Sequence, residues 1–378
     1  MDVLPEQNTL HPWQSNVSNG FIQKAGATEP TLADKVAFLS QVRAYPAASD
    51  VVTRETHMSW VFLAGEKAYK LKKPVKFPYL DFSTLERREA ACRAELRLNR
   101  RLAADVYLGV VPLTQTAHGP SLSEKGQIVD WLVIMHRLDE ERMLDHRIAA
   151  RSIDVAKVDQ LCSVLAQFYL RARRVFKPPP VGISEWRRNI SINRQALLDS
   201  RFHLPVGLVW RIDRAQRRFL AERETLIANR IHAHRIVDGH GDLRPEHICL
   251  DTSPKVIDCL EFNANLRAID PVDELAYLSV ECERLGASWV GERIIKRVLC
   301  RLRDWVPEEL LWFYRCYRAT LRARLAIAHL LEPNPRTPKK WPAVAKAYLR
   351  IATKDALRIE RTVNLPAYHP AWRRSAAA

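Results

Sequence analysis

The segment HGDLRPEHICLDTSPKVIDCLEFN, residues 240–263, constrains the fold and chemistry of this chain more than any other. Its apolar runs, Ile248–Leu250 and Val256–Ile257, have the length of short strands and are separated by a turn sequence. A hairpin of this kind places Asp242 before its first strand and Asp258 after its second, on the same side. Such a pair suits phosphoryl transfer, in which one carboxylate accepts the proton of the attacking hydroxyl and the other binds Mg²⁺ on the nucleotide phosphates.

The same stretch resembles the Brenner-type motif of aminoglycoside phosphotransferases and choline kinases and, more remotely, the catalytic loop of protein kinases. By this resemblance Asp242 is the catalytic base, His240 buttresses the loop and Asp258 is the metal-binding aspartate. Arg244, in the variable part of the loop, joins them as a candidate catalytic residue. The resemblance implies ATP and Mg²⁺ as cofactors.

His247 is a departure from the motif. The relatives usually place asparagine five residues after the base, as a second metal ligand, and HGDLRPEH is typical of a bacterial subgroup resembling aminoglycoside phosphotransferases. Magnesium prefers hard oxygen ligands, so imidazole is a poor substitute. Three alternatives follow: His247 is not a ligand, the metal differs, or the activity is weakened.

The first part of the chain contains a predicted hairpin formed by Trp60–Ala64 and Ala68–Lys73. Alternation places Lys70 and Lys72 on one face of its second strand. The residues AYK that end at Lys70 resemble the end of the VAIK strand of kinases, which implies that Lys70 contacts the α- and β-phosphates. Lys72 faces the same way and remains a rival.

A helix is predicted after this hairpin, with Ser83 and Glu86 as its capping box. Glu95 interrupts an otherwise apolar face of that helix, and a buried carboxylate there is costly unless it is paired. The resemblance implies Lys70 as its partner. Glu89, about two turns earlier, is the alternative.

Two further positions are expected to contact the nucleotide. Ser59, with Thr56 and His57, occupies the place where kinases carry a glycine-rich phosphate loop. Met135 opens a predicted hinge, against which the adenine would lie. The chain contains no GxxxxGK[ST] motif, so it is not a P-loop enzyme.

The predicted fold class is α+β, a protein-kinase-like two-lobe fold with a small β-rich N-lobe and a large, mainly helical C-lobe. We expect a flexible arm over residues 1–30, the N-lobe over 31–138 and the C-lobe over 139–378. Further strands are predicted over residues 106–113 and 128–135, and helices over 32–42, 155–170, 206–232, 273–331 (two or three) and 343–362. Asp273, in a segment resembling an acidic turn of the family, is expected to cap a helix and to tie down the catalytic loop.

The formal net charge of +16 and the pI near 9.7 favour anionic partners. We expect much of this charge to form a solvated helical face carrying Arg315, Arg318, Arg322 and Arg324. No nucleic-acid motif is present, so nucleic acid is an improbable partner. No apolar run reaches the roughly 18 residues of a membrane span, and no signal-peptide pattern opens the chain. Its 7 scattered cysteines suggest reduced thiols and a cytoplasmic location.

These features favour an ATP-dependent phosphotransferase that acts on a hydroxyl group of a small molecule. The positive charge favours a neutral or anionic acceptor over a polycationic one. The alternative, motivated by His247, is a catalytically weak or inactive nucleotide-binding module of the same fold. A nucleic-acid-binding protein is a third hypothesis, and it rests on charge alone.

Overall fold

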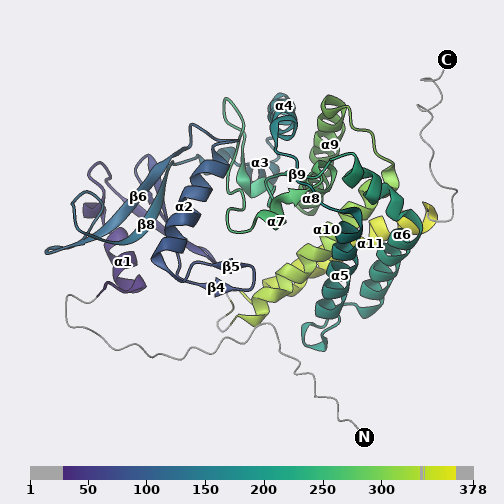
Figure 1. Ribbon diagram of the computed structural model, residues 1–378, viewed down its shortest axis with the longest axis horizontal. Helices are drawn as coiled ribbons and strands as arrows, with labels where there is room; N and C mark the ends of the chain where they lie inside the picture. The colour runs from purple at the N-terminus through teal and green to yellow at the C-terminus, as the bar shows by residue number, and fades with distance from the viewer. Residues whose placement is uncertain (1–28, 333–334, 336, 363–378) are drawn as a thin grey trace, which may run out of the picture. The chain divides into compact units, whose positions relative to one another are not determined.

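The computed structural model describes residues 29–332, 335 and 337–362. The predicted arm over residues 1–30 lies almost entirely outside this range. The described residues form two compact units, shown by residue colour in Figure 1. The β-rich unit contains the described residues up to Arg93 together with Gly109–Met135, and the helical unit contains Ala94–Leu108 and the described residues from His136 onward.

The β-rich unit is built on an antiparallel sheet with the strand order β1-β2-β3-β8-β6-β7. The strands are β1 (Val51–Glu55), β2 (Ser59–Ala64), β3 (Lys67–Lys72), β6 (Tyr107–Thr116), β7 (Gly119–Ser121) and β8 (Gln127–His136). The predicted hairpin is confirmed as β2 and β3, in which Ser59 pairs with Lys72 and Val61 with Lys70. Gly65 takes the positive φ of 55° that its tight turn requires.

The first helix, α1 (Leu32–Leu39), is held against the sheet by a buried ion pair. Lys35 Nζ donates to Asp130 Oδ2 at 2.9 Å and to the main-chain oxygen of Val129 at 2.7 Å. Asp130 Oδ1 accepts from Arg88 Nε at 2.7 Å, so one buried carboxylate on β8 anchors both α1 and the start of α2 (Leu85–Asn99). The short pair β4 (Lys76–Phe77) and β5 (Leu80–Asp81) precedes α2.

The capping box predicted on Ser83 is wrong by one position. Thr84 accepts a hydrogen bond from the backbone N–H of Arg87 at 3.3 Å, whereas the Ser83 hydroxyl donates to Asp81 at 2.6 Å. A turn stabilised by Asp81 therefore precedes the helix and moves its start one residue further along the chain.

The helical unit contains most of the helices. They are α3 (Leu144–Ala149), α4 (Val155–Arg171), α5 (Pro179–Leu197), α6 (Val206–His232), α7 (Ala264–Arg267), α8 (Pro271–Arg284), α9 (Ser288–Leu302), α10 (Glu308–Ala328) and α11 (Lys340–Thr362). Helices α3, α5 and α7 were not predicted, and Pro179 opens α5 at its first position. A kink in α6 at Arg223, whose φ is −133°, was not predicted either. None of the described helices has the length and apolar character that a membrane span needs.

Helix α10 lies at the centre of the helical unit, where it packs against α5, α6, α8 and α11. Aromatic rings fill the interface. Phe313 stacks on Phe219 of α6 with their ring centroids 4.4 Å apart, and Tyr317 meets Trp186 of α5 edge to face at 4.5 Å. This core fixes α8, which carries several groups of the site described below.

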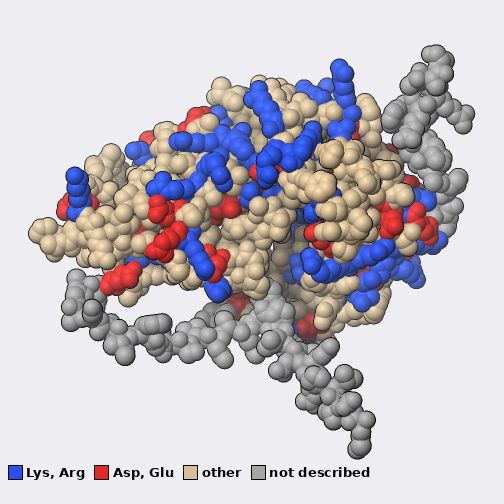
Figure 2. Space-filling view, viewed as in Figure 1, with Lys and Arg blue, Asp and Glu red and all other residues tan. Residues whose placement is uncertain are grey.

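The expected solvated arginine face on α10 is wrong. Arg315 is buried and donates to Asp355 at 3.0 Å, while Arg318 donates to Asp273 at 2.5 and 2.7 Å and Arg322 to Glu281 at 2.7 Å. The carboxylates come from α8 and α11, so these arginines cross-link helices. The face in Figure 2 carries other Lys and Arg side chains, interspersed with acidic ones.

Candidate active site

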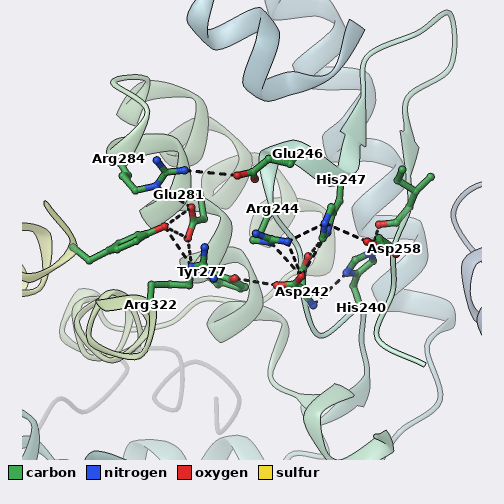
Figure 3. A network of polar contacts seen from close by, with 12 residues as sticks. His240, Asp242, Arg244, Glu246, His247, Asp258, Tyr277, Glu281, Arg284 and Arg322 are labelled. Atoms are coloured by element: carbon green, nitrogen blue, oxygen red, sulfur yellow. Dashed lines mark hydrogen bonds and ion pairs between the residues drawn. The ribbon is translucent and has the colours of Figure 1, made fainter. Parts of the chain in front are cut away.

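The predicted hairpin is confirmed and brings the ends of the motif together. Strand β10 (Ile248–Cys249) pairs antiparallel with β11 (Lys255–Val256), and the N–H of Ile257 donates to the main-chain oxygen of His247 at 2.9 Å. Asp242 precedes the first strand, with a short helical turn over Pro245–His247 between them, and Asp258 follows the second strand. Figure 3 shows the polar network around these residues.

Asp242 is held through both carboxylate oxygens. Oδ1 accepts from the Tyr277 hydroxyl on α8 at 3.0 Å, and Oδ2 accepts from Arg244 Nε at 3.1 Å. Burial raises the pKa of Asp242, but Arg244, His247 and Arg322 lower it by more, so the net shift is downward. The carboxylate is therefore ionised at neutral pH and can accept a proton.

His240 is a buried, neutral brace between the loop that carries Asp242 and the end of β11. The N–H of Asp242 donates to Nδ1 at 3.3 Å, and Nε2 lies 2.9 Å from the main-chain oxygen of Ile257. Because a backbone N–H can only donate and a carbonyl can only accept, Nε2 carries the proton of the ring. Burial lowers the pKa of His240 to about 3, so the ring stays neutral at pH 7.

His247 spans the distance between the two aspartate segments. Nδ1 donates to the main-chain oxygen of Asp242 at 2.9 Å, which leaves the lone pair of a neutral ring on Nε2. Nε2 lies 3.0 Å from Arg244 Nη2 and 3.6 Å from Asp258 Oδ2. In this arrangement the guanidinium of Arg244 contacts Nε2, so the lone pair that would bind a metal ion is already engaged.

Asp258 has a fixed main chain and a partly exposed side chain. Its φ is 63°, its N–H donates to the Tyr107 hydroxyl at 3.2 Å, and the next N–H, of Cys259, donates to Asn99 Oδ1 at 2.9 Å. Asn99 is itself fixed by a hydrogen bond to the main chain of α2. The Asp258 side chain remains 45% exposed, which leaves it accessible to a metal ion.

Glu274, on α8, holds the backbone of the loop that carries Asp242. Its buried carboxylate accepts from the N–H of His240 at 3.1 Å, the N–H of Gly241 at 2.5 Å and the Tyr169 hydroxyl at 2.9 Å. Burial raises the pKa of Glu274, and these three donors compensate for the buried charge. Gly241 has a φ of 87°, and a Cβ there would meet Leu260 at 2.9 Å.

The two roles predicted for Asp273, capping a helix and holding the loop, are filled by the nearby Asp270 and Glu274. Asp270 is the N-cap of α8 and accepts from the N–H of Val272 at 2.9 Å, whereas Asp273 pairs with Arg318. Glu274 contacts the loop. Four residues of the site were not predicted from the sequence: Glu274, Tyr277, Asn99 and Tyr107. No sequence pattern singles out Glu274, because Asp273 beside it is also a buried carboxylate of α8.

The residues expected to contact the nucleotide lie in both units. Within β3 of the β-rich unit Lys70 is half-buried, whereas Lys72 is fully buried, with its Nζ 5.0 Å from the centroid of the Phe82 ring. Ser59 and Met135 are also buried in that unit. In the helical unit Glu95 is fully buried. The alternative, Glu89, is partly exposed on α2 and accepts from Arg93 at 2.8 Å.

The relatives that match this chain in sequence are uncharacterised proteins. No protein-family model matches the chain. Uncharacterised proteins of Mycobacterium tuberculosis and Mycobacterium bovis are 33% identical over 323 residues, which is 82% of this chain. The chain spans 61% of the length of these relatives.

Solved structures of low sequence identity share the fold. A choline/ethanolamine kinase family protein from Mesorhizobium loti aligns with 88% of this chain and 99% of its own, at 12% identity and a TM-score of 0.51. Choline kinase from Cryptosporidium parvum aligns with 88% of this chain and 98% of its own, at 11% identity and a TM-score of 0.51. The predicted fold class is thereby confirmed: the chain has the protein-kinase-like fold, with a β-rich unit and a larger, mainly helical unit.

Proposed function

We propose that this protein transfers the γ-phosphoryl group of ATP to a hydroxyl group of a small molecule. The observation that carries the proposal is the position of one imidazole. His247 contacts the segment of Asp242 at 2.9 Å and the carboxylate of Asp258 at 3.6 Å. Two carboxylates, one ionised and one partly exposed, therefore lie on either side of a single ring. Phosphoryl transfer needs two carboxylates that lie close together in this way.

Asp242 is the proposed catalytic base. Its Oδ2 would accept the proton of the acceptor hydroxyl as the acceptor oxygen bonds to the γ-phosphorus and the bond from that phosphorus to the β,γ-bridging oxygen breaks. Tyr277 keeps Oδ1 fixed at 3.0 Å, so Oδ2 is the oxygen that can exchange its partner. His240 and Glu274 fix the loop backbone that carries Asp242.

Asp258 is the proposed protein ligand of Mg²⁺. No three His, Cys, Asp or Glu side chains meet as a metal site anywhere in the part of the chain that the structure describes. This fits Mg²⁺, which often takes one or two carboxylates and completes its shell with phosphate oxygens and water. When bound, the ion would neutralise charge on the phosphates. We propose that His247 positions the two loops and is not a ligand, because Arg244 occupies its lone pair.

Lys72 replaces Lys70 as the preferred lysine for the phosphates. Burying an ammonium group fully costs free energy unless a negative group compensates its charge, and Lys72 is fully buried. Lys70 is only half-buried, so this cost is smaller there. Glu95 is equally buried, and Ser59 and Met135 remain the proposed contacts to phosphate and adenine.

The proposal is tested by following the γ-phosphoryl group. The protein is incubated with [γ-³²P]ATP, Mg²⁺ and fractionated small-molecule extract, and the labelled products are separated by chromatography. We expect label in a phosphorylated small molecule, formed only with metal and protein. ATP that binds but is never consumed with any fraction would contradict the proposal.

That last outcome would favour an inactive nucleotide-binding module. One observation supports this second candidate: Arg244 donates to the carboxylate oxygen that the mechanism requires. A thermal-shift titration separates the two candidates, because stabilisation by ATP without metal, together with no turnover, fits only the module.

A further inference from the structure

Two arginines beside Asp242 retain unused hydrogen-bond donors. Arg244 donates through Nε and Nη2, to Asp242 and His247. Arg322 donates through Nε alone, to Glu281 at 2.7 Å and the Tyr348 hydroxyl at 3.3 Å. Among the described residues, neither Nη1 of Arg244 nor either terminal nitrogen of Arg322 makes a hydrogen bond. Their side chains are 23% and 20% exposed, so neither arginine is sealed off from solvent.

The two guanidinium groups act on the same carboxylate. Arg322 lies over the ring of Tyr277, 5.9 Å from its centroid, and the hydroxyl of that ring donates to Asp242 at 3.0 Å. Both arginines contribute to the downward shift of the pKa of Asp242, against the effect of burial. Figure 3 shows Arg244 beside Asp242 and Arg322 beside Tyr277. An anion that contacts both would therefore lie close to the proposed base.

Arg322 is held in place by a buried acid at one edge. Glu281 is fully buried and also accepts from the Tyr348 hydroxyl at 2.8 Å and from Arg284 Nε at 3.1 Å. Arg318, one turn earlier on α10, differs because Nε and Nη2 both bind Asp273. A guanidinium fixed through Nε presents its terminal nitrogens as a preorganised fork, which suits a carboxylate or phosphate group.

We propose that Arg244 and Arg322 form an anion subsite that binds a phosphate or carboxylate group of the acceptor. This inference rests on the proposed phosphotransferase function. An anion at the subsite would compete with Asp242 for Arg244 and so release Oδ2 to accept the hydroxyl of the same acceptor. The base would then be available when an anionic acceptor is bound, and a cationic acceptor would be repelled by both arginines.

The first test measures binding of inorganic phosphate alone, by isothermal titration. We expect Arg322→Gln and Arg244→Gln each to weaken phosphate binding at least about tenfold. Arg293→Gln is the matched control, since this arginine binds Asp159 on the surface of the helical unit at 2.7 and 2.8 Å, and it should bind phosphate as the wild type does. Phosphate that fails to bind, or that binds all three variants equally, would overturn the proposal.

The same variants decide whether the anion belongs to the acceptor or the nucleotide. ATP affinity should stay within about threefold in Arg322→Gln, and ATP should not displace phosphate. Loss of ATP affinity in parallel with loss of phosphate would assign the subsite to the nucleotide and overturn the acceptor assignment. Thermal unfolding checks that each variant folds. Arg244→Gln, on a loop, keeps the test decisive should Arg322→Gln fail to fold.

Turnover provides the final test, with acceptors matched in pairs: glycerol with glycerol 3-phosphate, and glucose with gluconate. The wild type should prefer the anionic member of each pair at least about tenfold in kcat/KM, and Arg322→Gln should reduce that ratio. Equal or greater transfer to the neutral members would overturn the subsite and leave the phosphotransferase function standing. No transfer to any acceptor, with phosphate still bound through Arg322, would instead count against the proposed function.

Discussion

The Nε2 atom of His247 lies 3.6 Å from Oδ2 of Asp258, at the position where relatives of this motif carry asparagine. The opposite ring nitrogen donates to the main chain of Asp242, so the ring links the two aspartate segments. Because Arg244 contacts Nε2, we propose that the ring positions the two segments and is not a metal ligand.

Metal dependence should therefore follow Asp258 and not His247. We expect Asp258→Asn to raise the Mg²⁺ concentration for half-maximal ATP binding more than about tenfold, and His247→Gln to change it less than about threefold. His247→Gln should still reduce turnover, because it disturbs the loops. Metal titrations of both variants with a fluorescent ATP analogue check this. A shift in His247→Gln as large as that in Asp258→Asn would make His247 a ligand.

Glu274 should contribute strongly to stability. Replacing it with Ala leaves the N–H groups of His240 and Gly241 and the Tyr169 hydroxyl without their acceptor, at a cost of about 3–5 kcal/mol. The measurement is the free energy of unfolding in urea. Glu222→Gln, which alters an exposed pair with Arg218, should change it by less than about 0.5 kcal/mol. A similar small effect in Glu274→Ala would disprove the bracing role.

The stability of the protein should depend on pH through His240. The pKa of this ring is about 3 in the folded protein and 6.5 when the ring is exposed, so below pH 6.5 the unfolded chain binds a proton that the folded chain does not. The contribution is thus complete above pH 6.5 and declines by up to about 1.4 kcal/mol per pH unit as the pH falls toward 3. His240→Gln should remove this component of the slope, whereas the exposed His146→Gln should keep it. Unfolding curves at pH 7, 6 and 5 that keep the same slope in His240→Gln would contradict the buried, neutral assignment.

Lys72 should matter more for ATP than Lys70. We expect Lys72→Met to weaken ATP binding at least about tenfold and Lys70→Met less than about threefold. A greater loss of ATP binding in Lys70→Met than in Lys72→Met would instead support the prediction made from the AYK resemblance.

The sequence predicted the hairpin between Asp242 and Asp258 because a hairpin depends on local pattern, and it predicted the fold class because the motif resembles that of a known family. Apolar runs of strand length and a turn identify β10 and β11 without tertiary information. The same pattern could not distinguish Lys70 from Lys72, since both face the same way on β3 and only packing makes Lys72 the buried one.

The contacts that position Asp242 are long-range and were missed. Tyr277 and Glu274 lie more than 30 positions along the chain from the loop they contact, on a helix whose register with the loop depends on packing. The arginines of α10 were mistaken for a solvated face for the same reason: their carboxylate partners on α8 and α11 cannot be recognised from spacing.

The central claim is that Asp242 accepts the proton of the acceptor hydroxyl. Its most direct test is the turnover of Asp242→Asn, measured as phosphorylated product per unit time at saturating ATP and Mg²⁺, beside ATP affinity. The account predicts a loss of kcat of at least about a hundredfold, with ATP affinity within about threefold of the wild type. A variant that turns over within a few-fold of the wild type would contradict it.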